Sequence, residues 1–165
     1  MKTKTFPTLF LTCLLTISAA LSTQVRADPA PKGAPDIYDV TADGSKQIAD
    51  ALVTAKKDGK IVLVQFGANW CGWCHKLHKL FDTDSKIAEE LKSHYVVVMV
   101  DVDKEHNKDV NAKYGNPTQH GLPVIVLLDA NGKQLTTKDT GELESGDHHD
   151  PDKVLTFLKT WSARK

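Results

Sequence analysis

The feature that most constrains this chain is the stretch 61–81, where an apolar run leads directly into two closely spaced cysteines. The run is rich in Val and Ile, has the length of a strand and ends at Gly67. From Trp73 onward, apolar residues recur at helical spacing. Because Cys71 and Cys74 stand at this junction, the sequence predicts a strand that delivers a C-x-x-C pair to the start of a helix.

This position has a chemical consequence for the cysteines. The unpaired N–H groups and the positive dipole end of a helix start stabilise a thiolate. We therefore expect Cys71, at the helix start, to be the exposed and attacking thiol, and Cys74, one turn further in, to be the more protonated one. A bond between them closes a loop too short to constrain the unfolded chain much, so chemistry is the better reason for the pair. We interpret it as a redox dithiol.

Residues 1–27 have the layout of a secretory signal peptide. Two lysines precede an uncharged and mostly apolar run at 6–21, and small residues allow cleavage after Ala27. A retained membrane anchor and a lipoprotein cut before Cys13 are alternatives that the short apolar run disfavours. The prediction is a periplasmic or secreted protein, without membrane attachment after cleavage, that keeps two of its three cysteines.

Charge and length exclude several classes of protein. The 21 basic and 21 acidic residues balance, and the predicted signal peptide removes three of the basic ones. Since no basic field remains, we expect no binding to nucleic acid or to a membrane surface. Residues 28–36 contain several prolines and predict a flexible leader that does not pack. The rest, 37–165, has the length of a single domain, which we expect to be monomeric.

The pattern along the domain predicts an α/β fold with a mixed central sheet flanked by helices. The first half is expected to contain an edge strand at 37–40, a helix capped by Asp43 or Ser45 and ending near Lys57, a strand at 60–66 and the cysteine helix. A helix from Asp84 or Ser85, a strand at 95–102 covered on both faces and a short helix ending at Gly115 should follow. The last part is expected to contain a strand at 124–128, an Asn131-Gly132 hairpin to a strand at 133–137, a polar loop at 139–150 and a helix opening at Asp150-Pro151. Ile48, Leu52 and Val53 are expected to face the core. The alternation predicts a parallel central strand pair, and the hairpin adds antiparallel strands at one side.

The run Trp-Cys-Gly-Trp-Cys at 70–74, with Gly-Leu-Pro at 121–123 before a later strand, resembles the thioredoxin superfamily. The resemblance spans about 37–163 and is strongest to exported bacterial thioredoxin-like proteins. It implies the thioredoxin fold and thiol–disulfide oxidoreductase activity without a cofactor. The implied partners are proteins that contain cysteines, together with a redox partner protein. It also implies that Cys71 attacks and that Cys74 resolves the mixed disulfide.

The same resemblance implies a substrate-binding surface around the cysteines. Pro123 would be a cis-proline packed against the pair, and the backbone of Leu122 would bind substrate. Trp70, Gly72 and Trp73 flank the attacking cysteine and would contact substrate as well. Shielding of the core is the alternative role for Trp70, and an ordinary trans proline is the alternative for Pro123.

The sequence departs from the thioredoxin pattern at Gln65. Thioredoxins carry a buried aspartate six residues before the first cysteine, and a glutamine amide cannot accept a proton as that acid does. The Gly72-Trp73 dipeptide also differs from the Gly-Pro of ordinary thioredoxins. Since intervening residues tune the reduction potential, the direction of electron flow stays open.

Other functions can use the same residues. The Cys-x-x-Cys-His run at 71–75 matches the c-type haem attachment pattern, although Met99, in a strand, is a poor second axial ligand. His75 and His78 could join the cysteines in a metal site, but consecutive residues of a helix point in different directions. The loop cluster His148-His149-Asp150 is expected to be exposed to solvent, with metal binding as the alternative. A further possibility is that the fold serves as an interaction partner and that the disulfide is only structural.

Overall fold

The computed structural model describes residues 28–164, so the predicted signal peptide lies outside the described part of the chain. The main elements are α1 (Gly44–Asp58), β1 (Ile61–Gly67), α2 (Gly72–Thr83), α3 (Ser85–His94), β2 (Tyr95–Asp101), α4 (Lys108–Lys113), β3 (Val124–Leu128), β4 (Gln134–Asp139), β5 (Glu144–Ser145), β6 (His148–His149) and α5 (Pro151–Ser162). Three short 3-10 helices join them: η1 (Asp103–Glu105), η2 (Pro117–His120) and η3 (Thr140–Leu143).

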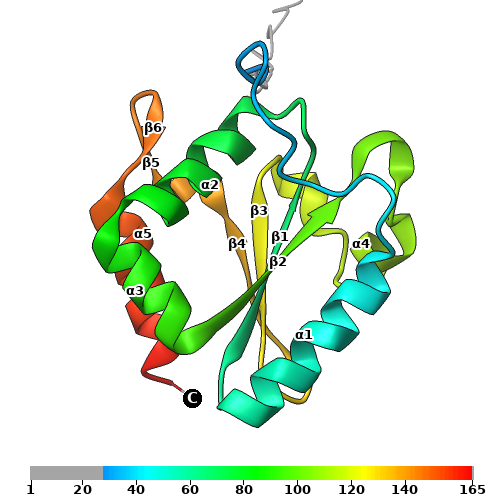
Figure 1. The fold of residues 1–165 in the computed structure, drawn as a ribbon, viewed down its shortest axis with the longest axis vertical. Coiled ribbons are helices and arrows are strands. Elements are labelled where there is room, and N and C mark those ends of the chain that lie inside the picture. Colours follow the sequence, from blue (N-terminus) through cyan, green and yellow to red (C-terminus); the bar gives the residue numbers. More distant parts are fainter. Residues whose placement is uncertain (1–27, 165) are drawn as a thin grey trace, which may run out of the picture.

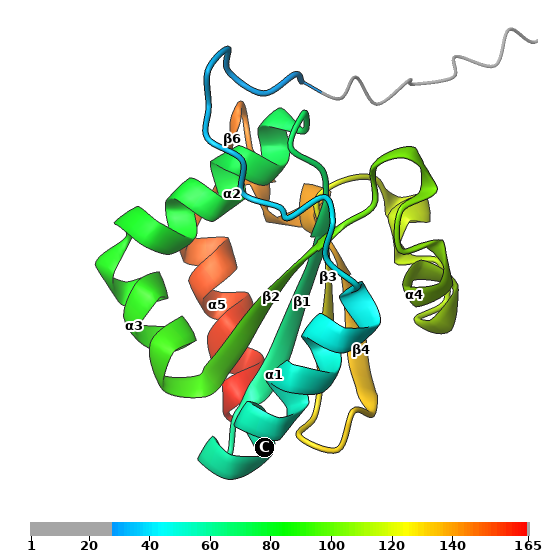
Figure 2. The same ribbon diagram turned by 45° about the vertical axis from the view of Figure 1, so that its right-hand side comes forward.

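A four-stranded sheet in the order β2-β1-β3-β4 forms the centre of the molecule (Figure 1). Strands β1 and β2 are parallel, and β3 and β4 run antiparallel to their neighbours. One face of the sheet packs against α1 and α4, and the other packs against α2, α3 and α5 (Figure 2). The predicted α/β fold with its mixed sheet is confirmed.

The ends of the helices follow from local sequence. Asp43, Asp84 and Asp150 cap α1, α3 and α5, because each aspartate side chain accepts hydrogen bonds from backbone N–H groups of the first turn. Helix α1 ends at Gly59, whose φ of 64° is the left-handed conformation that glycine adopts without strain. These caps, and the hairpin between β3 and β4, are as predicted.

Two predicted elements are wrong. The segment 37–40 forms no strand, because the side chain of Asn69 takes up its backbone hydrogen bonds. The stretch 139–150 is not a plain loop: it contains the end of β4, η3 and the β5–β6 hairpin, which packs beside α2.

Two predictions of burial are also wrong. Val53 is 72% exposed, since the inward stripe of α1 runs through Ile48, Ala51 and Ala55 instead. The strand β2 was expected to be covered on both faces, but its residue Val97 is 38% exposed. The reason is that β2 lies at the edge of the sheet.

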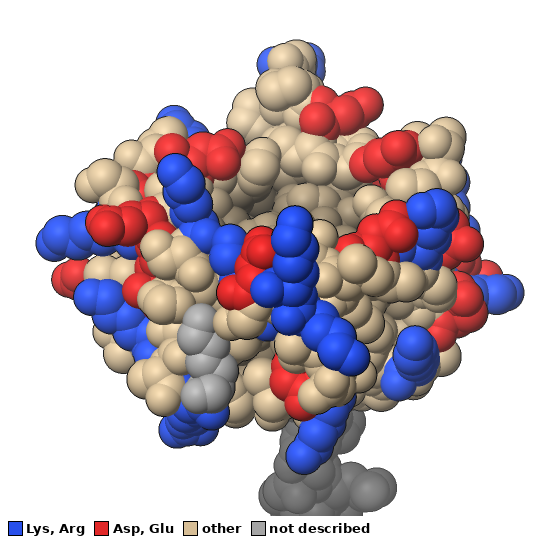
Figure 3. Space-filling model, turned by 60° about the horizontal axis from the view of Figure 1, so that its bottom comes forward, with Lys and Arg blue, Asp and Glu red and all other residues tan. Residues whose placement is uncertain are grey.

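The surface agrees with the charge pattern of the sequence. On the face shown in Figure 3, basic and acidic side chains are interspersed rather than gathered by sign. Within residues 28–164, none of the helices is both long enough and apolar enough to cross a membrane.

The core predicts a sharp contrast between two substitutions. Leu63→Ala should lower the free energy of unfolding by about 2–5 kcal/mol, because Leu63 in β1 is completely buried and the change leaves a cavity. Val53→Ala should change it by less than about 0.5 kcal/mol, because Val53 faces solvent. Urea denaturation measures both, and similar losses would contradict the packing described.

Candidate active site

The cysteine pair lies at the point where β1 gives way to α2. Cys71 is the N-cap of α2, and its sulfur accepts a hydrogen bond of 3.1 Å from the backbone N–H of Cys74. The first turn of α2 contains no acidic residue that would oppose a negative charge there. An opened disulfide therefore leaves Cys71 where helix N–H groups and the helix dipole stabilise a thiolate.

The two cysteines form a disulfide, with their Cα atoms 5.3 Å apart. Cys74 has no exposed surface and Cys71 is only 2% exposed. The expectation of an exposed Cys71 is therefore wrong in this structure. The reason is a segment that precedes the domain in the sequence.

The segment is residues 28–30, the first part of residues 28–43, which we call the N-terminal arm. The N–H of Ala30 donates to the Trp70 carbonyl, and the N–H of Gly72 donates to the Asp28 carbonyl, both at 2.8 Å. Pro29 thereby forms an antiparallel bridge with Cys71. Residues 28–30 pack, although a flexible leader was expected at 28–36; the division into signal peptide, leader and domain stays a prediction.

Gly72 is what permits this close approach. A Cβ atom at this position would lie 2.6 Å from the Asp28 carbonyl oxygen and 2.7 Å from that of Pro29. Any larger residue would push the arm away from the disulfide. Gly72 thus contacts the arm, whereas its predicted contact with substrate stays a prediction.

On another side, Leu122, just before β3, packs against the buried cluster of Tyr38, Cys71 and Cys74. The Leu122–Pro123 peptide bond is cis, as the resemblance implied, and the Thr140 hydroxyl donates to the Pro123 carbonyl. A cavity of about 440 Å³ opens here. Its lining includes four of the five predicted substrate contacts, Trp70, Trp73, Leu122 and Pro123. The structure brings them together, and their role in binding stays a prediction.

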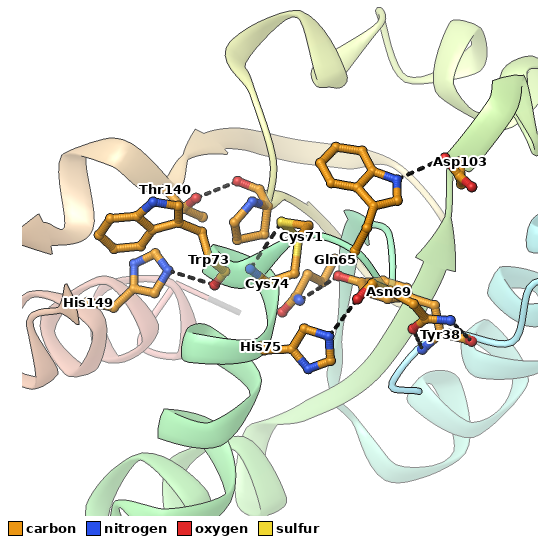
Figure 4. The surroundings of a disulfide bond; sticks show 12 residues. Tyr38, Gln65, Asn69, Cys71, Trp73, Cys74, His75, Asp103, Thr140 and His149 are labelled. Carbon is orange, nitrogen blue, oxygen red and sulfur yellow. Dashed lines mark hydrogen bonds between the residues drawn. A yellow bond between two sulfur atoms is a disulfide. The ribbon is translucent and has the colours of Figure 1, made fainter. Parts of the chain in front are cut away.

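The two tryptophans are held in different ways. Trp70 is 47% exposed, and its indole N–H donates to Asp103 at 2.8 Å, which favours the surface position over the core-shielding alternative. Trp73 lies beside the β5–β6 hairpin, with its ring centroid 5.3 Å from that of His149 (Figure 4). His149 is only 3% exposed, so the prediction of solvent exposure is wrong for it, while His148 is exposed.

The histidines of α2 have other partners. His75 Nε2 lies 2.8 Å from the Asn69 carbonyl oxygen, and His78 Nε2 lies 3.5 Å from Asp82. In the part of the chain that the structure describes, no three His, Cys, Asp or Glu side chains are grouped to hold a metal ion. The Cys71–Cys74 bond also uses both sulfurs that thioether links to haem would need. Neither alternative has geometric support in residues 28–164.

Sequence reasoning missed two residues beside the pair, Tyr38 and Asn69. Gln65 is completely buried, and its Nε2 donates to the Tyr38 hydroxyl at 2.7 Å. Asn69 Oδ1 accepts from the N–H groups of Ile37 (3.0 Å) and Tyr38 (2.9 Å), and Nδ2 donates to the Tyr38 carbonyl at 2.9 Å. The one available signal was Gln65, since a buried amide requires partners.

Comparisons with known proteins agree with this geometry. A model of the thioredoxin-like domain family matches residues 48–147. Protein disulfide-isomerase 1 of Dictyostelium discoideum is 30% identical over 124 residues, which cover 75% of this chain and 27% of that protein. Disulfide bond reductase DsbH of Chlamydia pneumoniae is 31% identical over 97 residues, which cover 53% of this chain and 57% of that protein.

A solved structure shows the same arrangement. The crystal structure of a disulphide isomerase from Xylella fastidiosa Temecula1 has a TM-score of 0.69 and 31% sequence identity; the match covers 76% of this chain and 96% of that one. The chain belongs to the thioredoxin-like domain family. Its relatives are named as a protein disulfide-isomerase and a disulfide bond reductase.

His149 should make stability depend on pH. Burial lowers its pKa from 6.5 to about 4, so the folded protein keeps it neutral where the unfolded chain protonates it. Stability is therefore lost as the pH falls from about 6.5 to about 4, by on the order of 3 kcal/mol. The free energy of unfolding of wild type, measured between pH 7 and pH 4.5, should fall more steeply than that of His149→Gln.

The exposed neighbour supplies the control. His148→Gln should retain most of the wild-type dependence on pH, because burial, rather than the charge of His148, is the main cause of the lowered pKa of His149. If His149→Gln kept the full wild-type slope, the assignment to His149 would be refuted.

Proposed function

We propose that this chain is a thiol–disulfide oxidoreductase that exchanges disulfides with cysteine-containing proteins outside the cytoplasm and works with a redox partner protein. One observation carries the proposal: the Cys71 sulfur caps α2 and accepts the N–H of Cys74, in a buried disulfide cluster against which Leu122, of the cis Leu122–Pro123 peptide, packs. The Dictyostelium and Chlamydia relatives are longer than the matched region, so their activities are extended to this chain only as part of this proposal.

Cys71 has the attacking role because it lies at the N-terminus of α2, where its thiolate is stabilised. Its thiolate attacks one sulfur of a substrate disulfide; a Cys71–substrate bond forms, and the other substrate sulfur leaves with the electron pair. Cys74 then attacks Cys71 and releases the first substrate sulfur as a thiol. In the oxidising direction the same steps run in reverse.

The cavity beside Pro123 is the proposed docking groove for an extended segment of the substrate protein. Trp70 and Trp73 provide apolar contact area, and the backbone of Leu122 provides hydrogen-bonding groups. The arm covers the Gly72 side of the disulfide, whereas this groove is lined by Trp70 and Trp73, which flank Cys71 in the sequence. We propose that the protein acts here as a monomer, without a cofactor.

The roles of the two cysteines can be separated by substitution. Cys71→Ser should reduce disulfide exchange with a protein substrate such as insulin to the background rate, because no attacking thiolate remains. Cys74→Ser should instead accumulate a mixed disulfide between Cys71 and the substrate, since no resolving thiol remains. Turbidity of reduced insulin and non-reducing gels measure these outcomes.

A third variant is the matched control. Cys13→Ser should keep wild-type exchange, because Cys13 lies in the predicted signal peptide. Full activity of Cys71→Ser would refute the proposed function. The reduction potential of the Cys71–Cys74 pair then decides the direction, because reductants and oxidants of this kind differ by about 100 mV or more.

The proposed location rests on the signal-like pattern of residues 1–27. Expression of the full chain in a bacterium should yield an exported protein whose intact mass corresponds to a chain that starts at Asp28. Ala27→Arg should block this cleavage, because signal peptidase sites require small residues. A protein that keeps its N-terminal Met in the cytoplasmic fraction would contradict the proposed location.

A further inference from the structure

We propose that Tyr38 is a positioning residue for the resolving cysteine: its neutral hydroxyl donates a hydrogen bond to the Cys74 sulfur when the disulfide opens. The inference rests on the proposed function. In this chain Gln65 replaces the buried acid of thioredoxins, and the Tyr38 hydroxyl is the group that assists Cys74.

The hydroxyl and the sulfur are close neighbours beneath Gly67. A Cβ atom on Gly67 would lie 2.1 Å from the Tyr38 hydroxyl oxygen and 2.7 Å from the Cys74 sulfur. Both groups therefore occupy the space that any other residue at position 67 would fill. Tyr38, Cys71 and Cys74 also form one buried cluster.

The hydrogen bonds around Tyr38 leave its proton available. Gln65 Nε2 donates to the hydroxyl oxygen at 2.7 Å, so this oxygen is an acceptor in that bond (Figure 4). Among residues 28–164, the hydroxyl has no further hydrogen-bond partner, and the buried Oε1 of Gln65 has none. Tyr38 thus brings a free donor to the site, and Gln65 brings a free acceptor.

The charge environment makes a donor valuable here. Cys74 is completely buried, and burial raises the cost of a thiolate. Burial also raises the pKa of Tyr38 well above that of free tyrosine, and the charge of Asp101 in β2 adds to this, so the hydroxyl stays protonated and donates. Asp101 from β2 opposes a negative charge nearby, and His75 is turned toward Asn69. Tyr38 therefore offers Cys74 a neutral hydrogen-bond donor.

The donor acts in the resolving step. The Cys74 sulfur attacks the Cys71 sulfur of the mixed disulfide, the Cys71–Cys74 bond forms and the Cys71–substrate bond breaks. The substrate sulfur leaves with the electron pair and ends with the proton that Cys74 has lost. Tyr38 transfers no proton: its hydrogen bond stabilises the Cys74 thiolate that attacks.

The arm is what places this hydroxyl. Asn69, two residues before Cys71, binds both the N–H and the C=O of Tyr38 at 2.9 Å. The loop that carries the cysteines therefore also fixes the backbone from which the hydroxyl reaches Cys74. Asn69 acts through Tyr38 and is a second positioning residue.

The test is the pKa of Cys74 in a Cys71→Ser background. The rate of alkylation of Cys74 is followed against pH by mass spectrometry of the peptide that contains it, so that Cys13 does not interfere. Adding Tyr38→Phe should raise this pKa by about 1, which means roughly tenfold less thiolate at neutral pH. In the chain with both cysteines, Tyr38→Phe should slow release of the mixed disulfide about tenfold.

Tyr95→Phe is the matched control, because its buried hydroxyl donates to the Leu158 carbonyl far along the sheet. It should cost stability and leave the pKa of Cys74 unchanged. Asn69→Ala, which keeps the hydroxyl but releases its backbone, should shift the pKa in the same direction as Tyr38→Phe. Far-UV circular dichroism establishes that each variant is folded.

An unchanged pKa of Cys74 in both folded Tyr38→Phe and folded Asn69→Ala would overturn the role of Tyr38. That result would leave the proposed function intact, because disulfide exchange depends on Cys71. Conversely, activity in Cys71→Ser would refute the proposed function whatever the pKa of Cys74 is.

Discussion

Hydrogen bonding along both edges of β1 is the constraint on which the rest of the structure depends. Strand β1 pairs with β2 on one side and β3 on the other, and all seven of its residues are buried. A strand held on both edges and covered on both faces has little freedom to shift its register. The dithiol follows directly after this strand, so its position relative to Pro123 at the start of β3 is fixed by the same ladder of hydrogen bonds.

One polar side chain stands inside this strand, and the structure has to accommodate it. An unpaired amide in the core costs on the order of 1–3 kcal/mol, so Gln65 requires a partner. Its cross-strand neighbours in the sheet, Met99 and Ile125, have apolar side chains that donate no hydrogen bond. The arm supplies the Tyr38 hydroxyl, and Asn69 holds the arm in place. Gln65 departs from the thioredoxin pattern, and the N-terminal arm lies outside the alternating helices and strands. The two are therefore parts of one hydrogen-bonded arrangement.

Local chemistry in the sequence was enough to predict most of the fold and the reactive pair. Aspartate caps, the Asn131-Gly132 turn and the apolar run of β1 each act within a few residues, and the C-x-x-C pair needs only its own helix. The errors come from contacts between distant residues. Tyr38 meets Gln65 and Asn69 across roughly thirty positions of chain, and His149 is buried by Trp73 of another element. The burial of Val97 was predicted wrongly, because the residues of a strand do not determine whether it lies at the centre or at the edge of its sheet.

The contact between Asp28 and Gly72 joins the start of the described chain to the reactive pair. The Asp28 carbonyl accepts the N–H of the residue next to Cys71, and its carboxylate lies 3.4 Å from Lys76 on the same helix. Atoms added or removed immediately before Asp28 therefore act on the surroundings of the dithiol, even though they are remote from it in sequence. An affinity tag fused at this end is a change to the active site, and a tag after α5 is the neutral choice for measuring its chemistry.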